Sequence, residues 1–243
     1  MWFAASVAGR FARAALALGE GEVCAAFRRS FYLRYPGERY ACVGDASLGH
    51  GPLNALVGDF RQAALGEQVA VSVASTWNPP TQPVAFNMKA LEKTKVPEEG
   101  LGCLLLGKHN ALAEHAQPAI EALDEWLRHG LAVPGGASGL IGLGPGLTPS
   151  GDDYLGGMMV ALHAVARDAQ ARALWRWLQP LLAAGTSALS AAHLAAAAEG
   201  EGHEALHAAL QEPSAESLER LDAVGHCSGW DALAGAAAVL RAN

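Results

Sequence analysis

The first hundred residues carry the apolar pattern of β-strands. Residues 68–75 alternate valine with less apolar residues, which predicts a strand with one buried face. Residues 22–35 are rich in Val, Phe and Tyr, and Pro36-Gly37 separates them from residues 39–43, a pattern typical of a hairpin. The apolar run at residues 101–106 has the length of a short buried strand. We therefore expect a mostly antiparallel β region.

From residue 110 onward the apolar period lengthens to three and four residues, as in an amphipathic helix that ends at Gly130. A link rich in Pro and Gly, residues 132–151, leads to an alanine-rich part with helical periodicity. The helices predicted in this part cover residues 151–167, 168–184, 187–199, 204–210, 215–224 and 229–241.

These patterns predict an α+β protein. An N-terminal, mostly antiparallel β region (residues 1–107) packs on a C-terminal, alanine-rich helical bundle (residues 108–243), and we expect one compact unit. The chain has 243 residues, of which 51% are apolar, so it is large enough for one large or two small domains. Alanine and glycine allow helices joined by short loops to pack closely.

Charge and cysteine spacing narrow the classes of function. The formal net charge of −7 argues against a surface that binds nucleic acid. The apolar N-terminal stretch precedes Arg10 and Arg13, whereas a secretory signal has its positive charge first, so we expect a cytoplasmic protein without a membrane span. The four cysteines lie far apart in the sequence and form no CxxC pair, which favours reduced thiols.

The string G-L-G-P-G-L-T-P-S-G-D-D at residues 142–153 is the most informative motif. Its glycines do not match a dinucleotide-binding fingerprint. Gly146 and Gly151 have P-loop spacing, but Asp152 and Asp153 stand where Lys and Ser/Thr would hold phosphate and magnesium, which excludes a P-loop.

A second copy of this helix start lies 78 residues further on. Residues 150–157 and 228–235 both read S-G-x-D-x-L-x-G. We expect Ser150 with Asp153, and Ser228 with Asp231, to form a capping-box-like pair at the start of a helix. Two ordinary helix caps remain an alternative to a functional site, although a cap does not need the preceding glycines or Asp152.

Helix starts preceded by glycines bind anions, and carboxylates beside them add proton-transfer or amide-binding groups. We expect an anionic group to be positioned by Gly144, Gly146, Thr148, Ser150, Gly151, Ser228 and Gly229. The candidate catalytic residues are Asp152, Asp153, His226 and Asp231. A structural role for His226 stays open, as do a nucleophilic role for Cys227 and a metalloprotease-like reading of the H-E-x-x-H string at residues 203–207.

The two helix-start strings, in this order, resemble a bacterial family typified by the AllH-like subunit of oxamate carbamoyltransferase. Residues 185–194 (G-T-S-A-L-S-A-A-H-L) and 49–54 (G-H-G-P-L-N) also resemble this family. The resemblance implies a carbamoyltransferase subunit of allantoin catabolism that acts on oxamate or carbamoyl phosphate together with other subunits. The ligand would then be a small anionic carbamoyl or amide metabolite.

Two other classes of function stay open at this stage. One is a non-catalytic ligand-binding or assembly subunit. The other is an Mg²⁺- or Mn²⁺-dependent hydrolase that uses Asp152, Asp153, Asp231 and His226, an oxygen-rich set. We assign no cofactor and no metal ligands from the sequence, although a divalent metal is a candidate. No Arg or Lys lies between Arg128 and Arg167, so a cation that clamps the substrate must come from elsewhere or from a partner chain.

Overall fold

The structure is a computed structural model that describes residues 1–86, 88–91, 94–130 and 132–242. Contacts divide the chain into two compact units, Met1–Pro80 and Thr81–Asn243. Residues 81–107, which the sequence pattern grouped with the β region, belong by their contacts to the second unit. Each unit has its own hydrophobic core and is described by itself.

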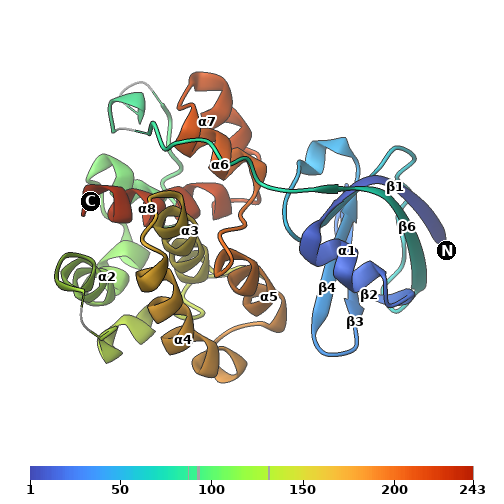
Figure 1. Ribbon diagram of the computed structural model, residues 1–243, viewed down its shortest axis with the longest axis horizontal. Helices are drawn as coiled ribbons and strands as arrows, with labels where there is room; N and C mark the ends of the chain where they lie inside the picture. Colours follow the sequence, from blue (N-terminus) through green and yellow to red (C-terminus); the bar gives the residue numbers. More distant parts are fainter. Residues whose placement is uncertain (87, 92–93, 131, 243) are drawn as a thin grey trace. The chain divides into compact units, whose positions relative to one another are not determined.

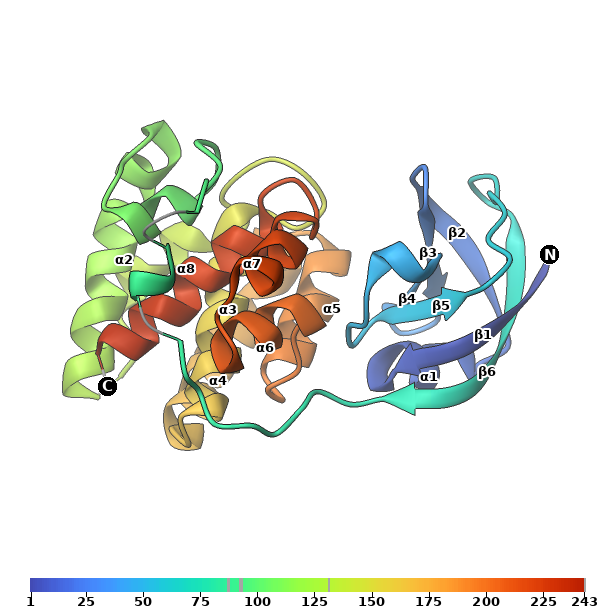
Figure 2. The ribbon, with the colours of Figure 1, turned by 90° about the horizontal axis from the view of Figure 1, so that it is seen from above.

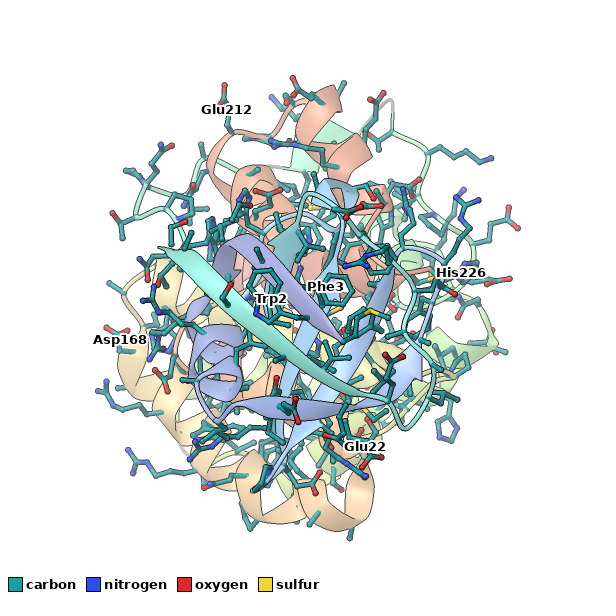
Figure 3. The ribbon with its side chains drawn as sticks, turned by 90° about the vertical axis from the view of Figure 1, so that its right-hand side faces the viewer. Trp2, Phe3, Glu22, Asp168, Glu212 and His226 are labelled. Atoms are coloured by element: carbon teal, nitrogen blue, oxygen red, sulfur yellow. The ribbon has the colours of Figure 1, made fainter. Side chains whose placement is uncertain are left out.

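The first unit is a six-stranded closed barrel with the strand order β1-β5-β4-β3-β2-β6 (Figure 1). Its strands are β1 (Trp2–Gly9), β2 (Glu20–Ala26), β3 (Ser30–Tyr35), β4 (Arg39–Gly44), β5 (Asn54–Val57) and β6 (Gln68–Trp77). The helix α1 (Arg10–Leu16) buries Ala12, Ala15 and Leu16. Between Trp2 and Phe3, both labelled in Figure 3, exposure falls from 59% to 3%, which is the alternation of a strand with one buried face.

The sheet is mixed, with four antiparallel and two parallel strand pairs, whereas the sequence predicted a mostly antiparallel β region. The predicted hairpin is present, because β3 and β4 pair antiparallel on either side of Pro36-Gly37. However, β1 pairs parallel with β6 and β4 pairs parallel with β5. Residues 22–35 form parts of two strands instead of one. Sequence patterns also missed β1, α1 and β5, because these short elements gain their stability from barrel closure rather than from a strong local period.

The second unit is helical. The helix α2 (Ala111–His129) begins after Asn110, whose side chain accepts a hydrogen bond from the N–H of Ala113, and ends at Gly130, which has a φ of 70°. The predicted strand at residues 101–106 is wrong, because η3 (Gly102–Leu106) is a short 3-10 helix. The strand prediction failed since a short apolar run does not distinguish a strand from a buried helical turn. Two further 3-10 helices are η2 (Met88–Leu91) and η4 (Gly135–Leu140), while η1 (Ala46–Leu48) lies in the first unit.

The six helices predicted in the alanine-rich part are all present, with ends that differ by a few residues. They are α3 (Ser150–Ala164), α4 (Asp168–Gly185), α5 (Ala188–Ala197), α6 (Glu204–Gln211), α7 (Ala215–Asp222) and α8 (Ser228–Arg241) (Figure 2). Among the described residues, no helix has the length and apolar character that a membrane crossing requires. A cytoplasmic location remains a prediction.

The helices α3 and α8 cross in direct backbone contact, because each has a glycine at the crossing. A Cβ added at Gly157 would lie 1.8 Å from the carbonyl oxygen of Ala232, and one added at Gly235 would lie 1.9 Å from that of Tyr154. Glycines 157 and 235 are 78 residues apart, and so are Tyr154 and Ala232. The crossing is therefore reciprocal, with each helix placing a glycine on the same turn of the other.

Candidate functional site

The two S-G-x-D motifs stand at the starts of α3 and α8, but they are not capping boxes. The helices begin at Ser150 and Ser228, and the residues in the cap positions are Pro149 and Cys227. Neither helix has a hydrogen bond from a capping side chain. The predicted pairing of each serine with the aspartate of its own helix is wrong, because each serine already lies inside the first turn.

Instead, each serine acts on the aspartate of the other helix. Ser228 and Thr148, which lies just before α3, lower the pKa of the Asp153 carboxyl group against the larger effect of burial, and Ser150 does the same for Asp231. The hydroxyl oxygens of Thr148 and Ser228 lie 3.1 Å apart. Each serine can face the aspartate of the other helix because the glycine crossing brings the first turns of α3 and α8 side by side.

Asp231 fixes the chain in front of η3. Its Oδ1 accepts hydrogen bonds from the N–H groups of Leu101 (2.6 Å) and Gly102 (2.9 Å). The side chain is buried, with 1% exposure. Burial raises the pKa of Asp231 to about 6, while the hydrogen bonds from Ser150, Leu101 and Gly102 act in the opposite direction. Asp231 therefore changes its charge close to neutral pH.

Asp153 has less hydrogen bonding than Asp231. Its Oδ2 is buried and has no hydrogen-bond partner among the described residues. Burial raises the pKa of Asp153 well above its usual range, and the carboxylates of Asp231 and Asp152 raise it further against the hydrogen bonds from Ser228 and Thr148. These effects favour the protonated form of Asp153, and a protonated carboxyl group is able to donate a hydrogen bond.

Asp152 points to a different set of partners. Its Oδ1 accepts from the N–H of Gly142 at 2.8 Å, and its Oδ2 accepts from the hydroxyls of Thr186 and Ser190. The side chain is 2% exposed. Asp152 thus ties the Gly-rich loop to the junction of α4 and α5. Since neighbouring residues on a helix point about 100° apart, it does not share the partners of Asp153.

The Gly-rich loop before α3 owes its path to glycine. Gly142, Gly144 and Gly146 have φ values of 69°, 112° and 95°, which other residues rarely adopt. The backbone N–H groups of Gly146, Leu147 and Thr148 donate no hydrogen bond to the described residues. An N–H-rich loop at a helix start is the ordinary form of an anion site.

His226 turns away from the carboxylates of the two helix starts. It lies on the surface, where Figure 3 labels it, and its Nε2 contacts Oε2 of Glu99. The adjacent Cys227 is buried, and burial raises the pKa of its thiol to about 11, with the neighbouring carboxylates acting in the same direction. A protonated thiol gives no support to a nucleophilic role. All four cysteines are free.

The H-E-x-x-H string does not form a metal site among the described residues. His203 accepts a hydrogen bond from the N–H of Ala205, and His207 accepts one from the N–H of Gly202. Asp152, Asp153, Asp231 and His226 likewise do not form a group of ligand atoms close enough for one ion in the part of the chain that the structure describes.

The structure thus brings Asp153, Asp231, Ser150 and Ser228 together with Thr148. It leaves Asp152 and His226 at the edges of this group. Sequence reasoning missed Glu99, Thr186 and Ser190. Thr186 and Ser190 lie within the segment at residues 185–194 noted for its resemblance, whereas nothing in the sequence links Glu99 to His226.

Fold and site together define an α+β protein with a buried carboxyl pair at a helix crossing. Residues 140–240 match the family model described as oxamate carbamoyltransferase subunit AllH. The match covers the Gly-rich loop and both helix starts, which is under half of the chain, and over these residues it confirms the AllH-like resemblance. No curated protein and no solved structure matches the chain significantly.

Proposed function

We propose that this protein is a subunit of an oxamate carbamoyltransferase. It would act with partner subunits in allantoin catabolism to move a carbamoyl group between oxamate and phosphate. In the direction of breakdown, oxalurate and phosphate give oxamate and carbamoyl phosphate. The observation that carries the proposal is the family match over residues 140–240, since it spans both helix starts.

The chemistry of these substrates suits the groups at the crossing. Oxalurate and oxamate each carry a carboxylate beside an amide, and phosphate is a second anion. The free N–H groups of residues 146–148 would bind an anionic oxygen. In its protonated form, which burial favours, Asp153 would donate its proton to a carbonyl or leaving nitrogen, and Asp231 would take part in the proton transfer.

Partner subunits are part of the proposal for an electrostatic reason. The stretch between Arg128 and Arg167 has no Lys or Arg, so the loop and the first turn of α3 offer only partial charges to an anion. A guanidinium or ammonium group from another chain would supply the remaining charge. Isolated protein should therefore bind the anions weakly and turn over poorly.

The test is an assay of carbamoyl phosphate formation from oxalurate and phosphate, with the protein alone and with the chains that co-purify with it. We expect turnover only in the complex. Asp153→Asn should lower it by about a hundredfold or more, because a proton donor is lost at unchanged shape. Asp222→Asn is the matched control, since Asp222 lies near α8 and its Oδ1 accepts from Nε1 of Trp230, a bond that Asn retains.

Two outcomes of this assay would contradict a catalytic role. A complex without turnover contradicts the proposal. A complex whose turnover is unaffected by Asp153→Asn and Asp231→Asn, but which falls apart without this chain, makes the protein an assembly subunit. The alternative of an Mg²⁺- or Mn²⁺-dependent hydrolase gains no support from the geometry, because its four residues have different partners.

A further inference from the structure

We propose that Glu99, His226 and Cys227 form a binding site for a thiophilic divalent metal ion, with Zn²⁺ as the natural occupant. The carboxylate oxygen, the imidazole nitrogen and the thiol sulfur lie within 4.8 Å of one another. The three residues come from two segments that are far apart in the sequence. The site is argued from these residues alone and does not rest on the proposed function.

The two segments are held together before any ion binds. Asp231 accepts from the N–H groups of Leu101 and Gly102, just beyond Glu99. On the other side, Nδ2 of Asn110 donates to the carbonyl oxygens of Glu98 and Gly100, both at 2.7 Å. The backbone that carries Glu99 is thus fixed on both sides, which reduces the entropy lost when a metal orders the site.

Gly100 permits the close approach of the two segments. It has a φ of 72°, and a Cβ placed on it would lie 2.9 Å from Cβ of Cys227 and 2.5 Å from Oδ1 of Asp231. Any larger residue would push residue 99 away from the thiol. The tight turn therefore serves to bring a carboxylate against a cysteine.

The electrostatic surroundings favour a cation. The groups that act on the Cys227 thiol besides burial are all acidic, namely Asp231, Glu99, Asp153 and Asp222, and those that are ionised attract a cation. Nε2 of His226 and Oε2 of Glu99 are already in hydrogen-bond contact, at the place where an ion would contact both atoms. On binding, the ion replaces this contact, and the thiol releases its proton to solvent.

The donor set selects the kind of metal. Thiolate and imidazole favour Zn²⁺ over Mg²⁺ or Mn²⁺, which prefer oxygen ligands. Three protein ligands leave one position of a tetrahedral ion open, as in catalytic rather than structural zinc sites. His226 and Glu99 are exposed, so this open position faces solvent and is accessible to a small ligand.

The experiment uses the full chain, purified without a histidine tag and stripped with a chelator. Zn²⁺ is titrated by calorimetry, and Co²⁺ is used as a spectroscopic probe. We expect one ion per chain and a thiolate-to-cobalt charge-transfer band. Cys227→Ser should abolish the band, while Glu99→Gln and His226→Ala should each weaken Zn²⁺ binding by at least about tenfold.

His129→Ala is the matched control. His129 is an exposed histidine paired with Glu125 at 3.3 Å, and among the described residues this pair has no third ligand beside it. Cys103→Ser controls for a second buried thiol. Absence of the band, or equal losses in His129→Ala and His226→Ala, would overturn the proposal. If Cys227→Ser does not fold, the Zn²⁺ affinities of Glu99→Gln and His226→Ala decide whether the site exists.

Discussion

The helices α3 and α8 begin with the same motif and cross through equivalent glycines, yet their aspartates have different surroundings. Asp231 accepts hydrogen bonds from two backbone N–H groups, and so organises the chain before η3. Asp153 is influenced by Ser228 and Thr148, and its buried Oδ2 has no hydrogen-bond partner among the described residues. The same local sequence thus gives one carboxyl group that holds structure and one that retains hydrogen-bonding capacity, and the neighbours alone make the difference.

The largest expected effect is a loss of stability when the glycines at the crossing of α3 and α8 are replaced. Gly157→Ala and Gly235→Ala should each lower the free energy of unfolding by about 3 kcal/mol or more, because the added Cβ would overlap a backbone carbonyl of the other helix. Urea unfolding followed by circular dichroism measures this loss.

Gly156→Ala is the control for this prediction. Its Cβ would lie 3.7 Å from Cβ of Ala197, an ordinary contact, so the change should stabilise α3 by about 0.5–1 kcal/mol through helix propensity. Equal effects at positions 156 and 157 would contradict the close crossing.

The second prediction concerns the pH dependence of stability. The pKa of Asp231 rises from 3.8 in the unfolded chain to about 6 in the folded one, so the folded state holds the proton longer. This group's contribution to stability is therefore present below pH 3.8 and is lost as the pH rises towards about 6. Asp231→Asn should remove up to about 3 kcal/mol of this pH dependence.

The measurement is the difference between the unfolding free energies of wild type and variant across this range. A difference is needed because His193 and His207, whose pKa values are lowered to about 4 by burial, change stability in the opposite direction. If the wild-type and Asp231→Asn curves run parallel, the shifted pKa of Asp231 is wrong. Asp153→Asn should show the same sign, since its pKa is also raised.

The third prediction concerns the residue before each aspartate. Asp152 in α3 corresponds to Trp230 in α8. Asp152→Ala leaves Gly142, Thr186 and Ser190 without their acceptor and should cost about 2 kcal/mol in thermal or urea unfolding. Trp230→Phe removes one hydrogen bond to Asp222 and should cost about 1 kcal/mol. A larger loss of stability in Trp230→Phe than in Asp152→Ala would contradict the larger structural role assigned to Asp152.

The smallest expected effect is the coupling energy between each serine and the aspartate of the other helix, and it is the sharpest test of that pairing. In double-mutant cycles built from alanine variants, Ser150 should couple to Asp231 by about 1 kcal/mol and to Asp153 by much less. A capping box would give the opposite ranking. The cycle of Ser228 with Asp153 should repeat the result on the other side of the crossing.

Sequence predicted the helical half well because its signals are local. Asn110 and Gly130 mark the ends of α2, and apolar periods mark the helices that follow. The barrel was predicted only in part, because β1 and β5 depend on partners distant in the chain. The matched motifs and their aspartates were found from the sequence, but the partners were not, since Leu101 and Asp231 are 130 residues apart.

The glycine crossing also limits how the helical unit moves. A shift of α3 along α8 by one residue would drive a side chain into a carbonyl oxygen of the neighbouring helix, at either of two points. The helices α3 and α8 therefore move together as one rigid body and do not slide past each other. A displacement of the Gly-rich loop at the start of α3 would therefore be passed to the segment that carries Glu99, because Asp231, in the adjacent first turn of α8, anchors that segment.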